Sequence, residues 1–283
     1  MTKVDCGISP TRHTGWPCIA RSRASDLTHC SATRSRCGSP ASVARASLRV
    51  THSHNATPGL SLREPCFSIV SSAIAVAQGA DMVVNLAAGL DARPYRMALP
   101  SHLQWIEVDL PELLAYKTEQ LAGETPRCNL ERVALDLSNV AARRELFERL
   151  NARATSVMIV SEGLVVYLAP EEVLQLATDL ARTPRFNRWA LDMVSPALMR
   201  MMLKTMGQEL QHAGAPFKFA PNEGPAFFAR AGWKPLEVRS LLHTAATLKR
   251  LSWRMRLFAL LPDSAGRVPS SPWGGVCLFE KNY

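Results

Sequence analysis

Acidic residues stand at the ends of several predicted strands, and their types and spacing suggest ligand binding. A carboxylate left unpaired in a crevice is energetically costly, so a series of them in equivalent places indicates a function. Open α/β sheets bind ligands at the carboxyl ends of their strands, where these residues are expected. The groups are Ala87-Ala88-Gly89-Leu90-Asp91-Ala92-Arg93, Asp109, Asp136-Leu137 and Ser161-Glu162-Gly163.

Each group offers a contact to a nucleoside-like ligand. Gly89 lets the backbone approach a ligand where a Cβ atom would collide. Asp109 follows 20 residues later, a spacing at which an acid on the second strand reaches both ribose hydroxyls. Asp136 can accept from an adenine amino group, the Leu137 amide can donate to a ring nitrogen, and Glu162 can face an ammonium group or a substrate proton.

The same residues have structural alternatives. Asp91 and Arg93 fit a helix cap with its ion pair as well as direct ligand contacts. Asp136 could cap the helix that follows it, and Asp109, two residues before Pro111, fits an N-terminal cap as well as a ribose ligand. It is the ordered series of four groups, rather than any one residue, that favours a ligand site.

The elements needed to position these residues alternate between strand and helix, with connections too long for hairpins. This alternation predicts a parallel, doubly wound α/β sheet. Short apolar runs predict strands at 82–87, 105–108, 131–135, 156–160 and 188–194, followed by strands at 236–239 and 275–280. Helices are expected at 67–78 with Gly79 as C-cap, from Pro111, and at 139–150, 170–181, 196–213, 224–231 and 244–261.

Net charge separates the N-terminal segment from the rest of the chain. The formal charge is +9, but residues 1–65 hold nine basic and three acidic residues and so contribute +6. The remaining +3 over 218 residues removes most of the case for a nucleic-acid-binding protein. We therefore expect two regions: a basic, Ser/Arg/Cys-rich and disordered segment at 1–63, and a folded domain at 64–283 with a helical insertion near 196–225. A transit peptide or an out-of-frame translation are the alternatives for the segment.

The cysteines and the hydropathy of the chain bear on metal binding, on the redox compartment and on membrane association. Four of the seven cysteines lie in the N-terminal segment at spacings that fit no zinc site, so no metal is expected. Cys66, Cys128 and Cys277 indicate reduced thiols and a cytoplasmic protein. No apolar run approaches the roughly 18 residues of a membrane helix, so no membrane partner is expected.

The sequence resembles the leucine carboxyl methyltransferase-like family, particularly the S-adenosylmethionine-dependent methyltransferases of actinobacteria. Four stretches carry this resemblance, which extends over about 64–283: residues 83–96 (VVNLAAGLDARPYR), 107–111 (EVDLP), 135–137 (LDL) and 161–168 (SEGLVVYL). The resemblance implies a Rossmann-like class I methyltransferase fold with helices on both faces of the sheet. Two departures stand out: Ala87-Ala88-Gly89 replaces the family's Gly-x-Gly loop, and residues 1–63 do not resemble its helical N-terminal region.

The resemblance also implies roles for the strand-end residues. Asp109 would bind the ribose, Asp136 and Leu137 the adenine, and Gly89 would lie under the methionine part with Glu162 near its amino group. The cofactor-binding residues expected overall are Ala87, Gly89, Asp91, Arg93, Asp109, Leu110, Asp136, Leu137 and Glu162. S-adenosylmethionine is the expected cofactor and a small molecule the expected methyl acceptor.

Methyl transfer mainly requires placement of the two reactants, so no catalytic triad is expected. A carboxylate acceptor is already ionised and needs no base. For a hydroxyl acceptor, His212 and His243 are weak candidates as bases. A protein that keeps the fold and binds the ligand without turnover is the alternative function, and a nicotinamide-dependent oxidoreductase is disfavoured because G-x-G-x-x-G is absent.

Overall fold

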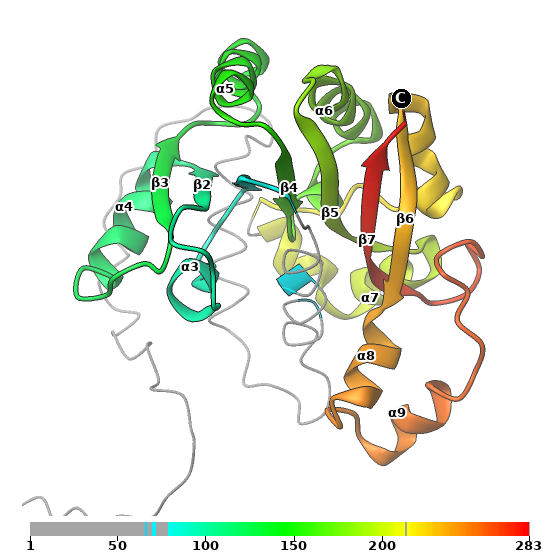
Figure 1. Cartoon of the computed structure of the whole chain (residues 1–283). Coiled ribbons are helices and arrows are strands. Elements are labelled where there is room, and N and C mark those ends of the chain that lie inside the picture. The colour runs from blue at the N-terminus through cyan, green and yellow to red at the C-terminus, as the bar shows by residue number, and fades with distance from the viewer. Residues whose placement is uncertain (1–65, 67–69, 72–78, 213, 283) are drawn as a thin grey trace, which may run out of the picture. The chain divides into compact units, whose positions relative to one another are not determined.

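The computed structural model describes residues 66, 70–71, 79–212 and 214–282, which contain a single seven-stranded sheet in the order β3-β2-β1-β4-β5-β7-β6. The strands are β1 (Met82–Leu86), β2 (Gln104–Asp109), β3 (Asn129–Ala134), β4 (Val157–Ser161), β5 (Phe186–Val194), β6 (Trp233–Ser240) and β7 (Gly274–Lys281). Neighbouring strands from β1 to β5 pair in parallel, and β7 is antiparallel to both β5 and β6. Figure 1 shows β7 pointing opposite to β4. The expected mostly parallel, seven-stranded sheet is confirmed.

The helices alternate with the strands, as the sequence predicts. They are α3 (Arg93–Arg96), α4 (Pro111–Gln120), α5 (Val140–Arg153), η1 (Val165–Tyr167), α6 (Pro170–Arg182), α7 (Pro196–His212), η2 (Gly224–Ala231), α8 (Leu241–Thr247) and α9 (Trp253–Phe258). Three of them, α4, α6 and α7, begin at a proline, the position where the missing N–H costs nothing and the fixed φ angle fits the helix.

Both faces of the sheet are covered by apolar side chains. The five residues of β1 are all buried, and its four apolar residues divide between two clusters, because successive side chains on a strand point to opposite faces. Val84 and Leu86 belong to a cluster that includes residues of α5 and α6, whereas Val83 belongs to a second cluster that includes Trp105 and Leu241 of α8. Burial on both faces explains why the central strands read as continuous apolar runs.

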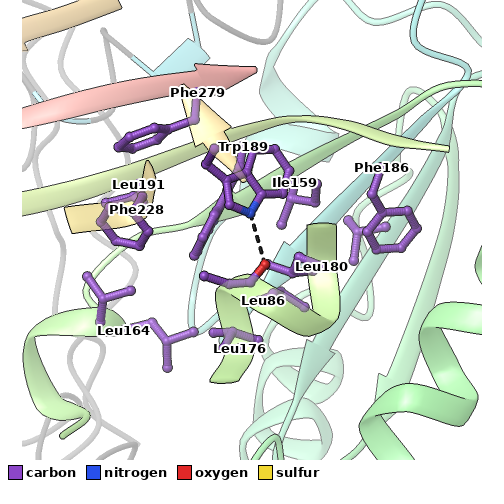
Figure 2. Close-up of a cluster of buried hydrophobic side chains, with 14 of the residues drawn as sticks. Leu86, Ile159, Leu164, Leu176, Leu180, Phe186, Trp189, Leu191, Phe228 and Phe279 are labelled. Carbon is purple, nitrogen blue, oxygen red and sulfur yellow. Dashed lines mark hydrogen bonds between the residues drawn. The ribbon is translucent and has the colours of Figure 1, made fainter. Parts of the chain in front are cut away.

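An aromatic cluster fills the sheet face beside α6. The Trp189 ring is fully buried, and its centroid lies 5.3 Å from that of Phe228 and 5.6 Å from that of Trp233. Its indole N–H donates to the hydroxyl oxygen of Ser161 at 2.9 Å, which satisfies its one polar atom. Figure 2 shows Trp189 between the side chains of Phe279, Leu191 and Ile159. This packing fixes β5 against β4, and with it the end of β4.

One expectation about the helices is wrong. The helix expected at 244–261 is broken into α8 and α9, because Lys249 adopts a left-handed conformation (φ 56°) and the Arg250 N–H turns back to the Ala245 carbonyl at 2.8 Å. Burial of Leu251 then holds the break. The short helix expected at 224–231 is confirmed and is of the 3-10 type. The strand expected at 236–239 extends over the whole of β6.

Some expectations fall on other parts of the chain. The segment 1–63 and most of the helix expected at 67–78 lie outside the described residues. Gly79, expected as the C-cap, has a φ angle of 89°, which suits glycine. The helical part of the insertion near 196–225 is α7.

Candidate functional site

Strand register brings the predicted residues to one edge of the sheet. Leu86 pairs with Val108, Asp109 pairs with Ala134, and Ser161 pairs with Leu191. The segments that follow β1 to β5 therefore begin side by side, at the carboxyl edge of the parallel strands. The residues predicted for ligand binding lie in these segments or at the strand ends themselves.

Asp109 joins the end of β2 to the loop after β1. It is 5% exposed; one carboxylate oxygen accepts the Gly89 N–H and the other accepts the Leu110 N–H, each at 2.7 Å. Burial raises the pKa of Asp109, while the two N–H groups and the nearby Lys117 favour the ionised form. The alternative of a helix cap is wrong, because α4 has Leu110 at its N-cap and receives no side-chain cap.

The loop after β1 contains two left-handed residues. Gly89 has a φ angle of 50°, which glycine adopts freely, but Ala87 has a φ angle of 53°. A Cβ atom in this region is strained by roughly 1–2 kcal/mol. Ala87 therefore holds a backbone conformation that its side chain disfavours.

Replacing Ala87 by glycine should raise the free energy of unfolding by about 0.5–1 kcal/mol, because relief of strain exceeds the added flexibility of the unfolded chain. Ala88→Gly is the matched control: Ala88 is buried and its φ angle is not positive, so this change should lower stability by about 1 kcal/mol. Equilibrium urea unfolding measures both. Equal losses in the two variants would show that Ala87 carries no strain.

An ion-pair network links the loop after β1 to the end of β4. The Arg93 Nε–H lies 2.9 Å from both carboxylate oxygens of Asp91, and the other end of the guanidinium pairs with Glu162. Asn85 donates to Asp91 at 2.8 Å, and the Cys66 thiol donates to Glu162 at 3.1 Å. The structural alternative for Asp91 and Arg93 is confirmed for the ion pair but not for the helix cap, because α3 has Ala92 at its N-cap and no side-chain cap. Arg93 is only 2% exposed. It is a buried residue that holds the carboxylates of Asp91 and Glu162 in place.

Asp136 and Leu137 form a separately anchored loop after β3. Asp136 accepts from the Ser138 N–H at 2.9 Å and from its hydroxyl at 2.7 Å. The proposed capping role is wrong, because Asn139 caps α5 by accepting the Ala142 N–H. The Leu137 carbonyl accepts from Arg143 at 2.8 Å, and Arg143 is itself paired with Asp179 of α6.

Sequence reasoning missed Asp192, near the end of β5. Its carboxylate accepts the Gly163 N–H at 2.7 Å, which fixes the turn next to Glu162. Burial raises the pKa of Asp192. Burial, together with the charge of Asp192, also raises the pKa of Tyr167 to about 12. The available signal was a single acid inside the otherwise apolar run 189–194. Asn85, also missed, gave the same signal in β1.

The structure thus brings most of the predicted residues into two bonded groups. Gly89, Asp109 and Leu110 form one group, while Asp91, Arg93 and Glu162 form the other. Asp136 and Leu137 lie in the neighbouring loop and bond to their own segment and α5. In the part of the chain described here, no group of three His, Cys, Asp or Glu residues is arranged to hold a metal ion.

The family model described as leucine carboxyl methyltransferase matches residues 25–181. The chain belongs to this family. The match begins inside the segment 1–63, so the likeness to the family reaches further toward the N-terminus than the motifs indicated. It ends at residue 181, whereas the motifs suggested a likeness up to residue 283.

Curated relatives agree with this membership. A protein of Parafrankia sp. (strain EAN1pec), named "Putative S-adenosyl-L-methionine-dependent methyltransferase", is 33% identical over 172 residues, which cover 57% of this chain and 54% of the relative. A protein of the same name from Mycobacterium marinum is 40% identical over 95 residues, which cover 33% of this chain and 30% of the relative. The chain thus spans about half the length, or less, of these curated relatives.

Solved structures agree with the fold. A SAM-dependent methyltransferase from Anabaena variabilis aligns with a TM-score of 0.53 and 12% identity, covering 86% of this chain and 95% of that one. A DUF574 family protein from Streptomyces avermitilis aligns with a TM-score of 0.50 and 12% identity, covering 78% and 82%. The Rossmann-like class I methyltransferase fold expected from the sequence is confirmed.

Proposed function

We propose that this chain binds S-adenosylmethionine and transfers its methyl group to an oxygen atom of a small molecule. The observation that carries the proposal is Asp109: a buried acid at the end of β2, fixed by the Gly89 and Leu110 amides. Each of its oxygens keeps a further lone pair, so the carboxylate can accept from two ribose hydroxyls without losing its backbone bonds. Membership of the family and the names of the relatives support the same cofactor.

The residues at the strand ends fit such a ligand. A Cβ atom built on Gly89 would meet nothing nearer than the Ala87 carbonyl at 3.9 Å, so the glycine is needed for its φ angle and for close approach of a ligand. The polar side chains at this edge include four carboxylates, which suit hydroxyl, amino and cationic groups and would repel a pyrophosphate. They are Asp109, Asp136, Glu162 and Asp192.

The cofactor supplies a methyl group made electrophilic by an adjacent sulfonium. Asp109 would bind the ribose hydroxyls, and the Asp136–Leu137 loop would contact the adenine edge. Arg93 would hold Asp91 and Glu162, leaving Glu162 beside the ammonium group. The chain would thereby fix one reactant so that an acceptor oxygen meets the methyl group in line.

A carboxylate acceptor suits the described residues better than a hydroxyl one. The ring of His212 bonds to the Gln208 carbonyl of its own helix at 2.7 Å, and His243 bonds to the Leu261 carbonyl at 3.2 Å. Both histidines therefore bond to backbone carbonyls of their own region, and within the part of the chain that the structure describes neither bonds to a residue of the site. A carboxylate, ionised at neutral pH, needs no base.

A thermal-shift and calorimetry panel with S-adenosylmethionine, S-adenosylhomocysteine and NAD tests the cofactor. We expect the first two ligands to stabilise the protein in proportion to ln(1 + [L]/Kd) and NAD to have no effect. Stabilisation by NAD alone would contradict the proposal. Release of S-adenosylhomocysteine from a pool of carboxylic acids tests turnover, and binding without release would identify a non-catalytic relative.

The remaining expectations are part of the same proposal: a small-molecule acceptor, no nucleic acid and a cytoplasmic setting. The distribution of charge supports the expectation that the chain binds no nucleic acid. Most of the net charge lies in residues 1–65, and the rest of the chain carries only +3. Salt-dependent retention on immobilised DNA by residues 66–283 would contradict it.

A further inference from the structure

The segment after α8 exposes an unusual amount of apolar side chain. We call residues 248–262 the α9 segment. No residue of α9 is buried, and Trp253 and Leu260 are 69% and 80% exposed. The large exposed side chains of the segment are Leu248, Trp253, Leu257, Phe258, Leu260 and Leu261. Six large apolar side chains exposed within fifteen residues exceed the scattered exposure that is normal for a protein surface, and such a concentration indicates an interaction site.

The α9 segment is also strongly basic. It carries Lys249, Arg250, Arg254 and Arg256 and no acidic residue. Trp253 and Leu257 are one turn apart on α9, and the arginines at 254 and 256 flank them on either side. The Arg254 guanidinium lies over the Trp253 ring at 5.3 Å. Apolar side chains bordered by arginines are typical of helices that lie on an anionic membrane surface.

Strand direction places this segment at the same edge as the candidate site. β5 and β6 are both antiparallel to β7, so they run the same way and end at the same edge of the sheet. α8 starts directly after β6, and Figure 1 shows α8 and α9 beyond that end of the strand. A surface bound by the α9 segment would therefore face the edge of the sheet that carries Asp109 and Glu162.

Charge argues against two other occupants. A second copy that docked through a two-fold contact would bring the four basic residues of its α9 segment against the four basic residues of the first copy. The N-terminal segment 1–65 carries +6 and would be repelled as well. An anionic partner fits this charge, and apolar side chains as exposed as Leu260 and Trp253 suit insertion between lipids.

We propose that the α9 segment binds peripherally to an anionic lipid bilayer. The proposal does not depend on the cofactor or on methyl transfer. Among the described residues no helix has the length and apolar content to cross a bilayer, and the sequence-based expectation of no membrane partner was based on the same criterion. The length and apolar content of a helix show whether it can span a bilayer. They do not show whether a short helix lies on the bilayer surface, which depends on the exposure of its side chains in the structure.

Co-sedimentation of the full chain with lipid vesicles tests the proposal. We expect binding to phosphatidylcholine vesicles that contain phosphatidylglycerol, little binding to phosphatidylcholine alone, and loss of binding as salt is raised. The variant Arg254→Glu/Arg256→Glu should lower the partition coefficient at least about tenfold. Trp253→Ser/Leu257→Ser should lower it while leaving the net charge unchanged.

Arg127→Glu/Arg149→Glu is the matched control, since it makes the same change in net charge at exposed positions elsewhere. Circular dichroism confirms that each variant is folded. Equal binding by the α9 variants and the parent would overturn the proposal, as would equal losses in the control. Absence of vesicle binding, together with a dimer in analytical ultracentrifugation that Trp253→Ser/Leu257→Ser dissociates, would assign the surface to a second copy and also overturn it.

Discussion

Replacing Asp109 by asparagine should weaken S-adenosylmethionine binding at least about 100-fold. The substitution removes two charge-assisted hydrogen bonds to the ribose hydroxyls, each of which contributes about 1.5–3 kcal/mol to the binding free energy. A tenfold change in Kd corresponds to about 1.4 kcal/mol. The amide has a single acceptor oxygen, so it also cannot serve the Gly89 and Leu110 N–H groups together. Calorimetry measures the change in Kd.

The same substitution should have only a small effect on stability. Burial raises the pKa of Asp109, so ionising it at neutral pH costs folding free energy, and this cost disappears in the amide. The gain offsets the loss of one backbone bond. Glu119→Gln is the matched control, because Glu119 is an exposed acid on the adjacent helix α4 and its replacement makes the same change in charge. Unchanged affinity in Asp109→Asn would remove the basis of the proposed function.

A pH dependence follows from the direction of the shift. The carboxylate must be ionised to accept from two hydroxyls, and its pKa lies above the ordinary value of an aspartate. On acidification, affinity should therefore start to fall at a higher pH than an unshifted aspartate, with a pKa of about 3.9, would allow. Calorimetric titrations at successively lower pH measure the midpoint. A loss only near the ordinary value would contradict the role of a buried carboxylate.

The strand-end residues were predictable because short-range patterns determine them. The parallel strands are buried on both faces, so each reads as a brief apolar run, and the residue that ends the run is visible in the sequence. Asp109, Asp136 and Glu162 were located in this way. The resemblance to the family then supplied their roles, which the pattern alone left open between ligand binding and helix capping.

Polar residues inside the apolar runs were harder to interpret. Asn85 and Asp192 lie within strands, where the pattern indicates only that a polar group faces the core or the strand end. Their partners, Asp91 and Gly163, are known only from the structure. A buried polar group requires a partner, so each such residue predicts an unidentified contact but not its location.

The break between α8 and α9 could not be predicted from local sequence. The stretch 244–261 holds neither glycine nor proline, and its apolar spacing fits one helix. Lys249 is held in a left-handed conformation by the returning Arg250 N–H and by burial of Leu251. Tertiary packing therefore overrides helix propensity here, and the same break leaves the α9 segment exposed.

Asp179→Asn should lower the free energy of unfolding by about 3–5 kcal/mol, the largest stability effect we expect. Asp179 is almost fully buried on α6 and pairs with Arg143 and Arg144 of α5. The Arg143 side chain is 6% exposed, so without the carboxylate its charge stays buried and uncompensated. Arg144→Met is the matched control: this arginine is half exposed, and losing its ion pair should cost at most about 1 kcal/mol.

A double-mutant cycle separates the ion pair from simple loss of packing. Arg143→Met and Asp179→Leu should each be strongly destabilising, whereas the double variant, with neither charge left buried, should be far less destabilised than the sum of the two. Because Arg143 also donates to the Leu137 carbonyl, the double variant loses the anchor of the proposed adenine loop. It should therefore recover most of its stability in urea unfolding but bind S-adenosylmethionine more weakly than Arg144→Met. Recovery of both stability and affinity would show that Arg143 supports the fold alone and does not position the Asp136–Leu137 loop.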